Sequence, residues 1–477
     1  MTDKILLQEQ EFLKSALAGD DTSRDFIISK LKEFLHTKNQ ELLRDFFMHQ
    51  HPADAAQIME FFEPETACSL IKYLDIEDQA RIFNYLPANF EAMMAKIMGR
   101  KELAIIVSAM SHDERADLFN RLSPEQQEEI LPALAQAERE DIRKLASYPE
   151  DTAGSVMTSD YSALQPDITA REAIEKLRRE APDKETIYQS FIIDKDRKLL
   201  GVVSLRELLV ASPGVKVKDI MNTHLIFGRV QDEAEDIADT MAKYDLMAMP
   251  IINGNDKLVG IVTFDDVHDI IEEEATEDFH KMGSISGHGE SISGMNFLKV
   301  SPWLLIQKRL PWLLALVFVN VLSGAGIAFF EDTIQAVVAL VFFLPLLIAS
   351  GGNAGAQSST LMVRAMATGD VQTKDWLKLL GREVGIAVIL GVGMAAAVSL
   401  IGIFRAGPEV ALVVALTMIA IVLFGSLIGC LLPFALTRLN LDPATASAPL
   451  ITSIADVGGI LIYFSIATWI LGTHSPA

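Results

Sequence analysis

The spacing of apolar residues in positions 1–150 follows a helical period. Apolar residues recur three and four positions apart in "AAQIMEFFEPETACSLIKYL" and "ADLFNRLSPEQQEEILPALAQA", which predicts amphipathic helices. Two longer segments, "FFEPETACSLIKYLDIEDQARIFNYLP" and "MSHDERADLFNRLSPEQQEEILPAL", share an acidic turn followed by a helix that ends in leucine. This recurrence predicts an all-α N-terminal domain, 1–150, built as a superhelix of stacked helix pairs.

Residues 151–275 contain an α/β unit that occurs twice. The first copy runs from "SVMTSDYSALQPDITAREAIEKLRRE" to "FIIDKDRKLLGVVSLREL", and the second from "DIMNTHLIFGRVQDEAEDIADTMAKY" to "PIINGNDKLVGIVTFDDV". Each copy starts at a methionine and continues with a strand, an amphipathic helix, two apolar strands around a polar turn, and a second helix. Met157 aligns with Met221, and Gly201 aligns with Gly260. The matching order resembles a tandem pair of CBS domains, a regulatory module that often binds adenine nucleotides.

The remainder of the chain is predicted to enter a membrane. The segment "HDIIEEEATEDFHKMG" has apolar residues along one side and predicts a helix that leads from the soluble half toward the membrane. A helix needs about 20 apolar residues to cross a bilayer. Five segments satisfy this requirement, at roughly 310–330, 334–357, 384–404, 409–436 and 444–471.

Charge is distributed unevenly between the two halves. After residue 300 the chain has eight basic and eight acidic residues, so the net charge of −23 belongs to residues 1–300. Such an acidic half repels phosphates, which argues against nucleic acid or anionic lipid as its partner and suits cations. Solubility alone would also explain many of these acids.

Basic residues and the N-terminus predict the orientation of the chain. Counting from a cytosolic soluble half, the outer flanks of the spans carry only Arg405, and the inner flanks carry Lys308, Arg309, Arg364, Lys374, Lys378, Arg382 and Arg438. Positive residues favour the cytosolic side. The segment "MTDKILLQEQEF" lacks the apolar core of a signal peptide. We therefore expect a multi-pass inner (plasma) membrane protein with its C-terminus outside.

One ionisable residue, Asp456 in "SIADVGGILIYF", lies deep inside a predicted span. A lone carboxylate facing lipid costs several kcal/mol, so it should face a cavity or bind a cation. A protonated or hydrogen-bonded structural aspartate is the alternative.

The segment "PLLIASGGNAGAQSSTL", residues 345–361, ends an apolar run with three glycines and two amides. The glycines permit a broken helix or close helix packing. Asn353 and Gln357 share one face because they are four residues apart. Close packing would explain the glycines but not the amides, so the segment is predicted to line an ion path.

The ligand types favour a hard cation. The predicted spans contain no cluster of Cys, His or Met, which disfavours soft transition metals. One carboxylate among neutral oxygens suits Mg²⁺, which keeps several of its waters. A symmetric dimer would bring two Asp456 carboxylates together on one axis.

These motifs in this order resemble the MgtE family of magnesium channels and transporters. The similarity rests on "PLLIASGGNAGAQSSTLMVRAMATGD", "SIADVGGILIY", the CBS pair and "EEEATEDFHKMG". It implies a homodimer whose central pore holds hydrated Mg²⁺ at Asp456, with Asn353 in a "GGN" signature near the pore. It also implies a connecting plug helix, 276–305, and a pore domain of five helices, 306–477.

The resemblance further implies feedback by cytosolic Mg²⁺. Carboxylates repel one another at low Mg²⁺, and bound Mg²⁺ draws the soluble domains together and closes the pore. The candidate regulatory acids are Asp113, Asp117, Glu235, Asp245, Asp266, Asp269, Glu274, Glu277 and Asp278.

ATP is a candidate ligand of the CBS pair. The second copy places Thr263 and Asp266 where this module often holds a ribose. The first copy, compared at Ser204 and Arg206, lacks that acid. We expect one nucleotide site at most.

Four other hypotheses stay open or are disfavoured. A CBS-regulated transporter for another substrate, such as chloride, lacks a buried Arg or Lys for an anion. A membrane sensor without transport would use Asp456 structurally, and another divalent cation could replace Mg²⁺. An enzyme is not expected, because the sequence shows no nucleophile–base arrangement, P-loop or "HExxH".

Overall fold

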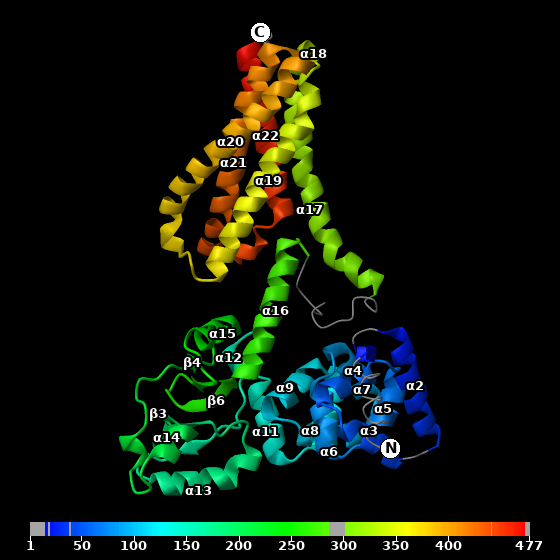
Figure 1. Cartoon of the computed structure of the whole chain (residues 1–477), viewed down its shortest axis with the longest axis vertical. Helices are drawn as coiled ribbons and strands as arrows, with labels where there is room; N and C mark the ends of the chain where they lie inside the picture. Colours follow the sequence, from blue (N-terminus) through cyan, green and yellow to red (C-terminus); the bar gives the residue numbers. More distant parts are fainter. Residues whose placement is uncertain (1–14, 18–19, 38–39, 286–300, 440, 473–477) are drawn as a thin grey trace. The chain divides into compact units, whose positions relative to one another are not determined.

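The computed structural model describes residues 15–17, 20–37, 40–285, 301–439 and 441–472 (Figure 1). The chain folds as two compact units, Met1–Glu273 and Glu274–Ala477. The N-terminal segment examined for a signal peptide lies outside the described residues. Residues 286–300 of the expected connecting segment, 276–305, also lie outside them.

The described residues of the N-terminal part of the first unit form helices joined by short turns, as predicted. From α4 to α7, each helix packs on the helix two further along the chain: α4 on α6, α5 on α7, α6 on α8, and α7 on α9. Proline in the first turn of α4, α5 and α10 favours helix initiation there. The helices are α2 (Asp21–His36), α3 (Gln40–Met48), α4 (Pro52–Met59), α5 (Pro64–Ile71), α6 (Ile76–Asn84), α7 (Ala88–Ile97), α8 (Arg100–Ala109), α9 (His112–Arg121), α10 (Pro124–Ile130) and α11 (Gln136–Leu145).

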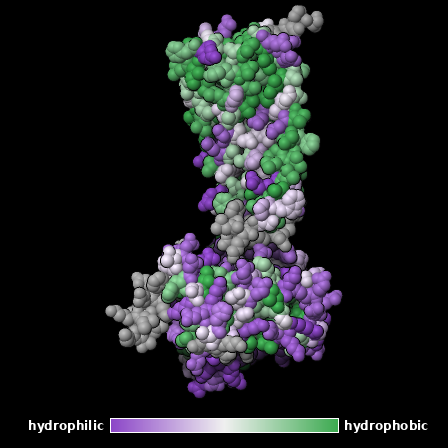
Figure 2. All heavy atoms as spheres, turned by 90° about the vertical axis from the view of Figure 1, so that its right-hand side faces the viewer, coloured by the Kyte–Doolittle hydropathy of each residue, from purple (hydrophilic) through white to green (hydrophobic). Residues whose placement is uncertain are grey.

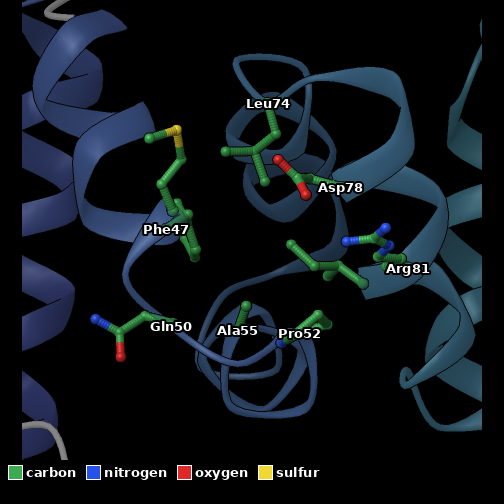
Figure 3. Close-up of a pocket in the computed structure, with 9 residues that line it drawn as sticks. Phe47, Gln50, Pro52, Ala55, Leu74, Asp78 and Arg81 are labelled. Carbon is green, nitrogen blue, oxygen red and sulfur yellow. The ribbon is translucent and has the colours of Figure 1, made fainter.

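A cavity of about 270 Å³ opens between α3, α4 and α6 (Figure 3). Phe47, Ala55 and Leu74 form its apolar wall, and Asp78 and Arg81 of α6 supply polar groups. Ligand pockets in proteins usually exceed about 300 Å³. None of the candidate site residues lines this cavity.

The two α/β copies have the same topology. In the first copy, β1 (Ala163–Leu164) pairs in parallel with β2 (Gln189–Ile193), which pairs antiparallel with β3 (Leu199–Ser204). The second copy repeats this order with β4 (Gly228–Arg229), β5 (Ala248–Ile252) and β6 (Leu258–Thr263). The helices of the pair are α12 (Ala153–Val156), α13 (Ala170–Glu180), α14 (Leu205–Val210), α15 (Ala234–Lys243) and α16 (Phe264–Met282).

The methionines and glycines that align between the copies pack against each other across the pair. A Cβ on Gly260 would lie 2.6 Å from the Met157 sulfur, and one on Gly201 would lie 2.7 Å from the Met221 sulfur. The side chain of Met157 is buried in the core of the second copy, whereas Met221 packs against the core of the first. The start of each copy therefore completes the sheet of the other.

The second unit contains five helices long and apolar enough to cross a membrane, counted over the described residues. They are α17 (Pro302–Phe329), α19 (Leu340–Ala367), α20 (Trp376–Ala406), α21 (Pro408–Arg438) and α22 (Ala448–Leu471), with the short α18 (Glu331–Ala336) between the first two. On the face shown in Figure 2, hydrophobic residues are more abundant on this unit and hydrophilic residues on the first.

Candidate ion path and cation-sensing acids

The glycines of α19 serve close helix packing. A Cβ on Gly425 of α21 would lie 2.2 Å from the carbonyl oxygen of Gly351, and one on Gly429 would lie 2.1 Å from that of Gly355. Two small-xxx-small pairs therefore bring the backbones of α19 and α21 together. Since α19 is continuous from Leu340 to Ala367, the packed alternative holds and the broken helix does not.

The two amides of α19 lie away from this packed face. Gly351, Gly352 and Gly355 are buried, whereas Asn353 and Gln357 are exposed in the isolated chain. Close packing therefore explains the glycines and leaves the amides without a structural role. Polar side chains inside a bilayer need protein or water beside them. This face of α19 consequently requires a covering surface or an aqueous path.

Asp456 lies in the first half of α22, two turns after its start, and α22 packs beside α19. Thr452 of α22 contacts Gly352, and Ile451 contacts Gly355. The Asp456 side chain is half-buried, and it makes no hydrogen bond or ion pair with any other residue that the structure describes. A carboxylate inside an apolar span without a partner in its own chain needs a cation, water or a second subunit.

His112 connects α9 to the first α/β copy. Its Nδ1 lies 2.7 Å from Asp141 Oδ2 and 2.6 Å from Ser159 Oγ, and its Nε2 lies 3.1 Å from Asp160 Oδ2. Asp141 belongs to α11, while Ser159 and Asp160 follow α12. The imidazole thus bridges the helical domain and the CBS pair, next to the predicted regulatory residue Asp113.

Three of the predicted acids come together in the first unit. Asp113 of α9 is largely enclosed, and its Oδ1 has no hydrogen-bond partner among the described residues. Burial, followed by the charge on Asp113, raises the pKa of Asp266 to about 8. Asp117 is exposed, yet the protein packed around it, before the charge on Asp113, raises its pKa to about 6.

Sequence analysis missed further acids of this cluster. Burial and then the charge on Asp113 raise the pKa of Glu185, which belongs to the first CBS copy, to about 7. Burial also raises the pKa of Glu114 to about 7, and Glu273 adds its charge near Asp117. The sequence pattern does not identify Glu185 as a member of this cluster, because Glu185 approaches Asp113 only when α9 docks on the CBS pair.

The other predicted acids lie elsewhere. Glu235 near the start of α15, Asp245 two residues after its end, and Asp269 of α16 are exposed. Glu274, Glu277 and Asp278 belong to the second unit, where Glu277 pairs with Lys281 at 2.8 Å. Burial, followed by the charge on Asp442, raises the pKa of Asp278.

These acids do not form a ready-made metal centre. Within the described part of the chain, no three His, Cys, Asp or Glu side chains are close enough to hold a metal ion together. Asp113, Asp117 and Asp266 interact as neighbouring charges. A hydrated ion, held through its waters, would suit this looser spacing better than a directly ligated one.

The proposed nucleotide residues bond to each other. The Thr263 hydroxyl and N–H donate to Asp266 Oδ2 at 2.6 and 3.1 Å, at the start of α16. In the first copy, the Ser204 hydroxyl donates to Glu207 Oε2 at 2.8 Å. The sequence comparison was therefore wrong about the first copy, because the acid that corresponds to Asp266 is Glu207.

A larger cavity lies at the first copy. It has a volume of about 600 Å³ and is lined by Tyr188, Ser204, Leu205, Arg206, Leu209, Val210 and Met247. Apolar side chains beside a single guanidinium suit a flat ring with an anionic tail.

The raised pKa values predict how the first unit responds to pH. Glu114, Asp117, Glu185 and Asp266 hold protons up to pKa values of about 6 to 8 when folded, against about 4 when unfolded. The folded state binds more protons between these limits, so its stability rises as pH falls from 8 to 6. Without Mg²⁺, the melting temperature of the full chain should therefore rise as the pH is lowered from 8 to 6. Mg²⁺ should raise the melting temperature less at pH 6 than at pH 8, and equal shifts would contradict the prediction.

Three family profiles match successive parts of the chain. The MgtE intracellular N domain matches residues 50–151, the CBS domain matches 153–214 and 217–273, and MgtE, described as a divalent cation transporter, matches 344–466. The magnesium transporter MgtE of Thermus thermophilus is 40% identical over 332 residues, which cover 69% of this chain and 72% of that protein.

Two solved structures resemble the soluble half. The soluble part of a magnesium transporter shares 30% identity with a TM-score of 0.50, covering 53% of this chain and 99% of that one. The cytosolic domain of the Mg²⁺ channel MgtE in complex with ATP shares 32% identity with a TM-score of 0.49, covering 50% of this chain and 98% of that one. Since the Thermus relative matches at this identity over more than two thirds of its own length, the chain belongs to the MgtE family of divalent cation transporters.

Proposed function

We propose that this chain forms a homodimeric membrane pathway that conducts hydrated Mg²⁺ into the cytosol. The observation that carries the proposal is Asp456, a half-buried carboxylate within an apolar helix that has no partner among the described residues of its own chain. The charge of Asp456 attracts a cation. The neutral amide of Asn353, on the neighbouring helix α19, suits an ion that keeps its water. The named Mg²⁺ transport of the Thermus relative supports Mg²⁺ as the ion.

A second copy of the chain would cover the exposed amide face of α19. A twofold axis along the membrane normal would bring two copies of Asp456 toward one path. The pair would double the attraction for a divalent ion without a cage of direct ligands. The bias of basic residues favours a cytosolic location for the soluble half and for the α21–α22 connection.

The acids of the soluble half would close this pathway at high cytosolic Mg²⁺. Burial raises the pKa values of Asp113, Asp117 and Asp266, and the charge on Asp113 adds to the rise at the other two. Burial of these carboxylates and the repulsion by Asp113 therefore oppose docking of α9 on the CBS pair at neutral pH. Bound Mg²⁺ relieves the repulsion and favours the docked state. A nucleotide in the cavity at Arg206 would act on the same CBS pair.

The test combines flux with limited proteolysis on the purified full chain. In liposomes, a Mg²⁺-sensitive dye should report uptake that falls as Mg²⁺ on the soluble side reaches the millimolar range. The same Mg²⁺ should protect the chain against cleavage near residues 270–300. Protection without any flux would favour a membrane sensor. Flux that Mg²⁺ does not reduce would mean that the pore conducts but the acids do not regulate it. Uptake of Co²⁺ or Mn²⁺ in place of Mg²⁺ would point to another divalent ion as the substrate.

A further inference from the structure

The end of α16 makes three separate contacts with the second unit, to which it belongs from Glu274 onward. Lys281 pairs with Asp442 in the connection between α21 and α22. Met282 packs against an apolar cluster formed by Val363, Ala444, Ala446 and Ile451. Beyond the helix, the Ser284 hydroxyl lies 2.7 Å from that of Ser447. An ion pair, an apolar contact and a hydrogen bond therefore seat one short segment at the start of α22.

Lys281 stands between carboxylates from two elements. Its Nζ lies 2.8 Å from Glu277 Oε1, one turn earlier on α16, and it also contacts Asp442 Oδ2. Only 26% of the Lys281 side chain and 34% of the Asp442 side chain are exposed. The charge of Asp278 lies close to the same Asp442. One ammonium thus neutralises part of a group of three acids.

Asp442 links this ion pair to the helix that carries Asp456. Its Oδ1 accepts a hydrogen bond from the Ala444 N–H at 2.7 Å, which starts the short turn Pro443–Thr445. That turn leads to Ser447, the residue before α22, and the Ser359 hydroxyl of α19 donates to the Ala446 carbonyl at 2.9 Å. Movement of the α16 end would therefore act on the turn between α21 and α22.

From this arrangement we infer that Lys281 is a tethered cation that holds the end of α16 on the pore half when no divalent ion is bound. Without the ammonium, Glu277, Asp278 and Asp442 would repel one another in the seated state. A divalent cation at these acids would then have to supply the missing positive charge. Lys281 is a positioning residue, because it touches the turn and not the ion path. Its effect on transport rests on the proposed function, whereas its effect on seating does not.

A cysteine pair at Ser284 and Ser447 measures seating directly. The two hydroxyl oxygens are already in contact, so Ser284→Cys with Ser447→Cys should form a disulfide when the segment is seated. The native Cys68 and Cys430 are buried and are replaced by alanine. The rate of disulfide formation in full-length protein in membranes is followed by mass spectrometry, in EDTA and in Mg²⁺ at about 10 mM. This concentration lies above the millimolar range in which Mg²⁺ is expected to inhibit uptake.

We expect rapid cross-linking in EDTA with Lys281 present. Lys281→Met should slow the EDTA rate at least about fivefold, about 1 kcal/mol of seating, and Mg²⁺ should restore it. Lys281→Arg should keep the original rate, and so should Lys378→Met, which removes an exposed lysine of the same unit. An EDTA rate unchanged by Lys281→Met overturns the inference. So does a slowing that Lys378→Met reproduces.

The flux assay on the same variants separates this inference from the proposed function. Lys281→Met should raise Mg²⁺ uptake at low Mg²⁺ and leave inhibition at high Mg²⁺ in place. If cross-linking responds as expected but no variant transports Mg²⁺, the tether stands and the transport proposal fails. If Lys281→Met changes neither cross-linking nor uptake while the parent transports, the tether fails and the transport proposal stands.

Discussion

Asp456→Asn is expected to reduce Mg²⁺ uptake into liposomes at least about tenfold, equivalent to about 1.4 kcal/mol. The substitution keeps the size and the oxygen of the side chain but removes the one carboxylate within α22. In an apolar span, that charge is the strongest local attraction for a divalent ion. Uptake is measured with a Mg²⁺-sensitive dye, with the amount of protein in the vesicles held constant.

Glu409→Gln is the matched control for Asp456→Asn. Glu409 is exposed at the start of α21, and its replacement also removes one carboxylate from the second unit. Uptake should stay at the parent level. Full uptake by the Asp456→Asn variant would assign Asp456 a structural role and leave the ion path to be sought elsewhere.

Gly425→Ala and Gly429→Ala are expected to disrupt the second unit. Each new Cβ would lie within 2.2 Å of a carbonyl oxygen on α19. A backbone atom cannot rotate away as a side-chain tip can, so the two helices must separate along their length. Overpacking usually costs about 1–3 kcal/mol. We expect a lower melting temperature in detergent and a smaller monodisperse fraction on size exclusion.

Gly385→Ala and Gly393→Ala provide the comparison. Both glycines lie in α20, and a Cβ on either would meet no atom within 4 Å. Alanine is also the better helix former, so these variants should melt at or above the parent temperature. If all four variants melt alike, close approach of α19 and α21 is not what holds the unit together.

The sequence predicted the elements of this fold better than their contacts. The five spans and the doubled α/β unit were confirmed, because each has a strong hydrophobic period or a repeated order. Asp456 was identifiable from sequence because a charge inside an apolar run is conspicuous. The glycines of 345–361 were compatible with two structures, and the choice required Gly425 and Gly429, about 70 residues away along the chain.

Other site residues depend on tertiary contacts that no local pattern contains. Glu185 joins Asp113 only after α9 docks on the CBS pair, and Lys281 meets Asp442 across 161 residues of sequence. The acid at Glu207 was overlooked because the copies were compared one position out of step. Its role as the helix-start acceptor for Ser204 shows the correct correspondence.

The exchange of Met157 and Met221 between the two CBS copies has a consequence for how this module can change. The first residues of each copy pack against the other copy, so neither copy has its full set of packing contacts when it stands alone. Loosening one sheet removes a packed methionine side chain from the other copy, so the two copies should lose order together. A strain imposed at one copy by an ion or a nucleotide would therefore reach the whole pair as a single cooperative transition.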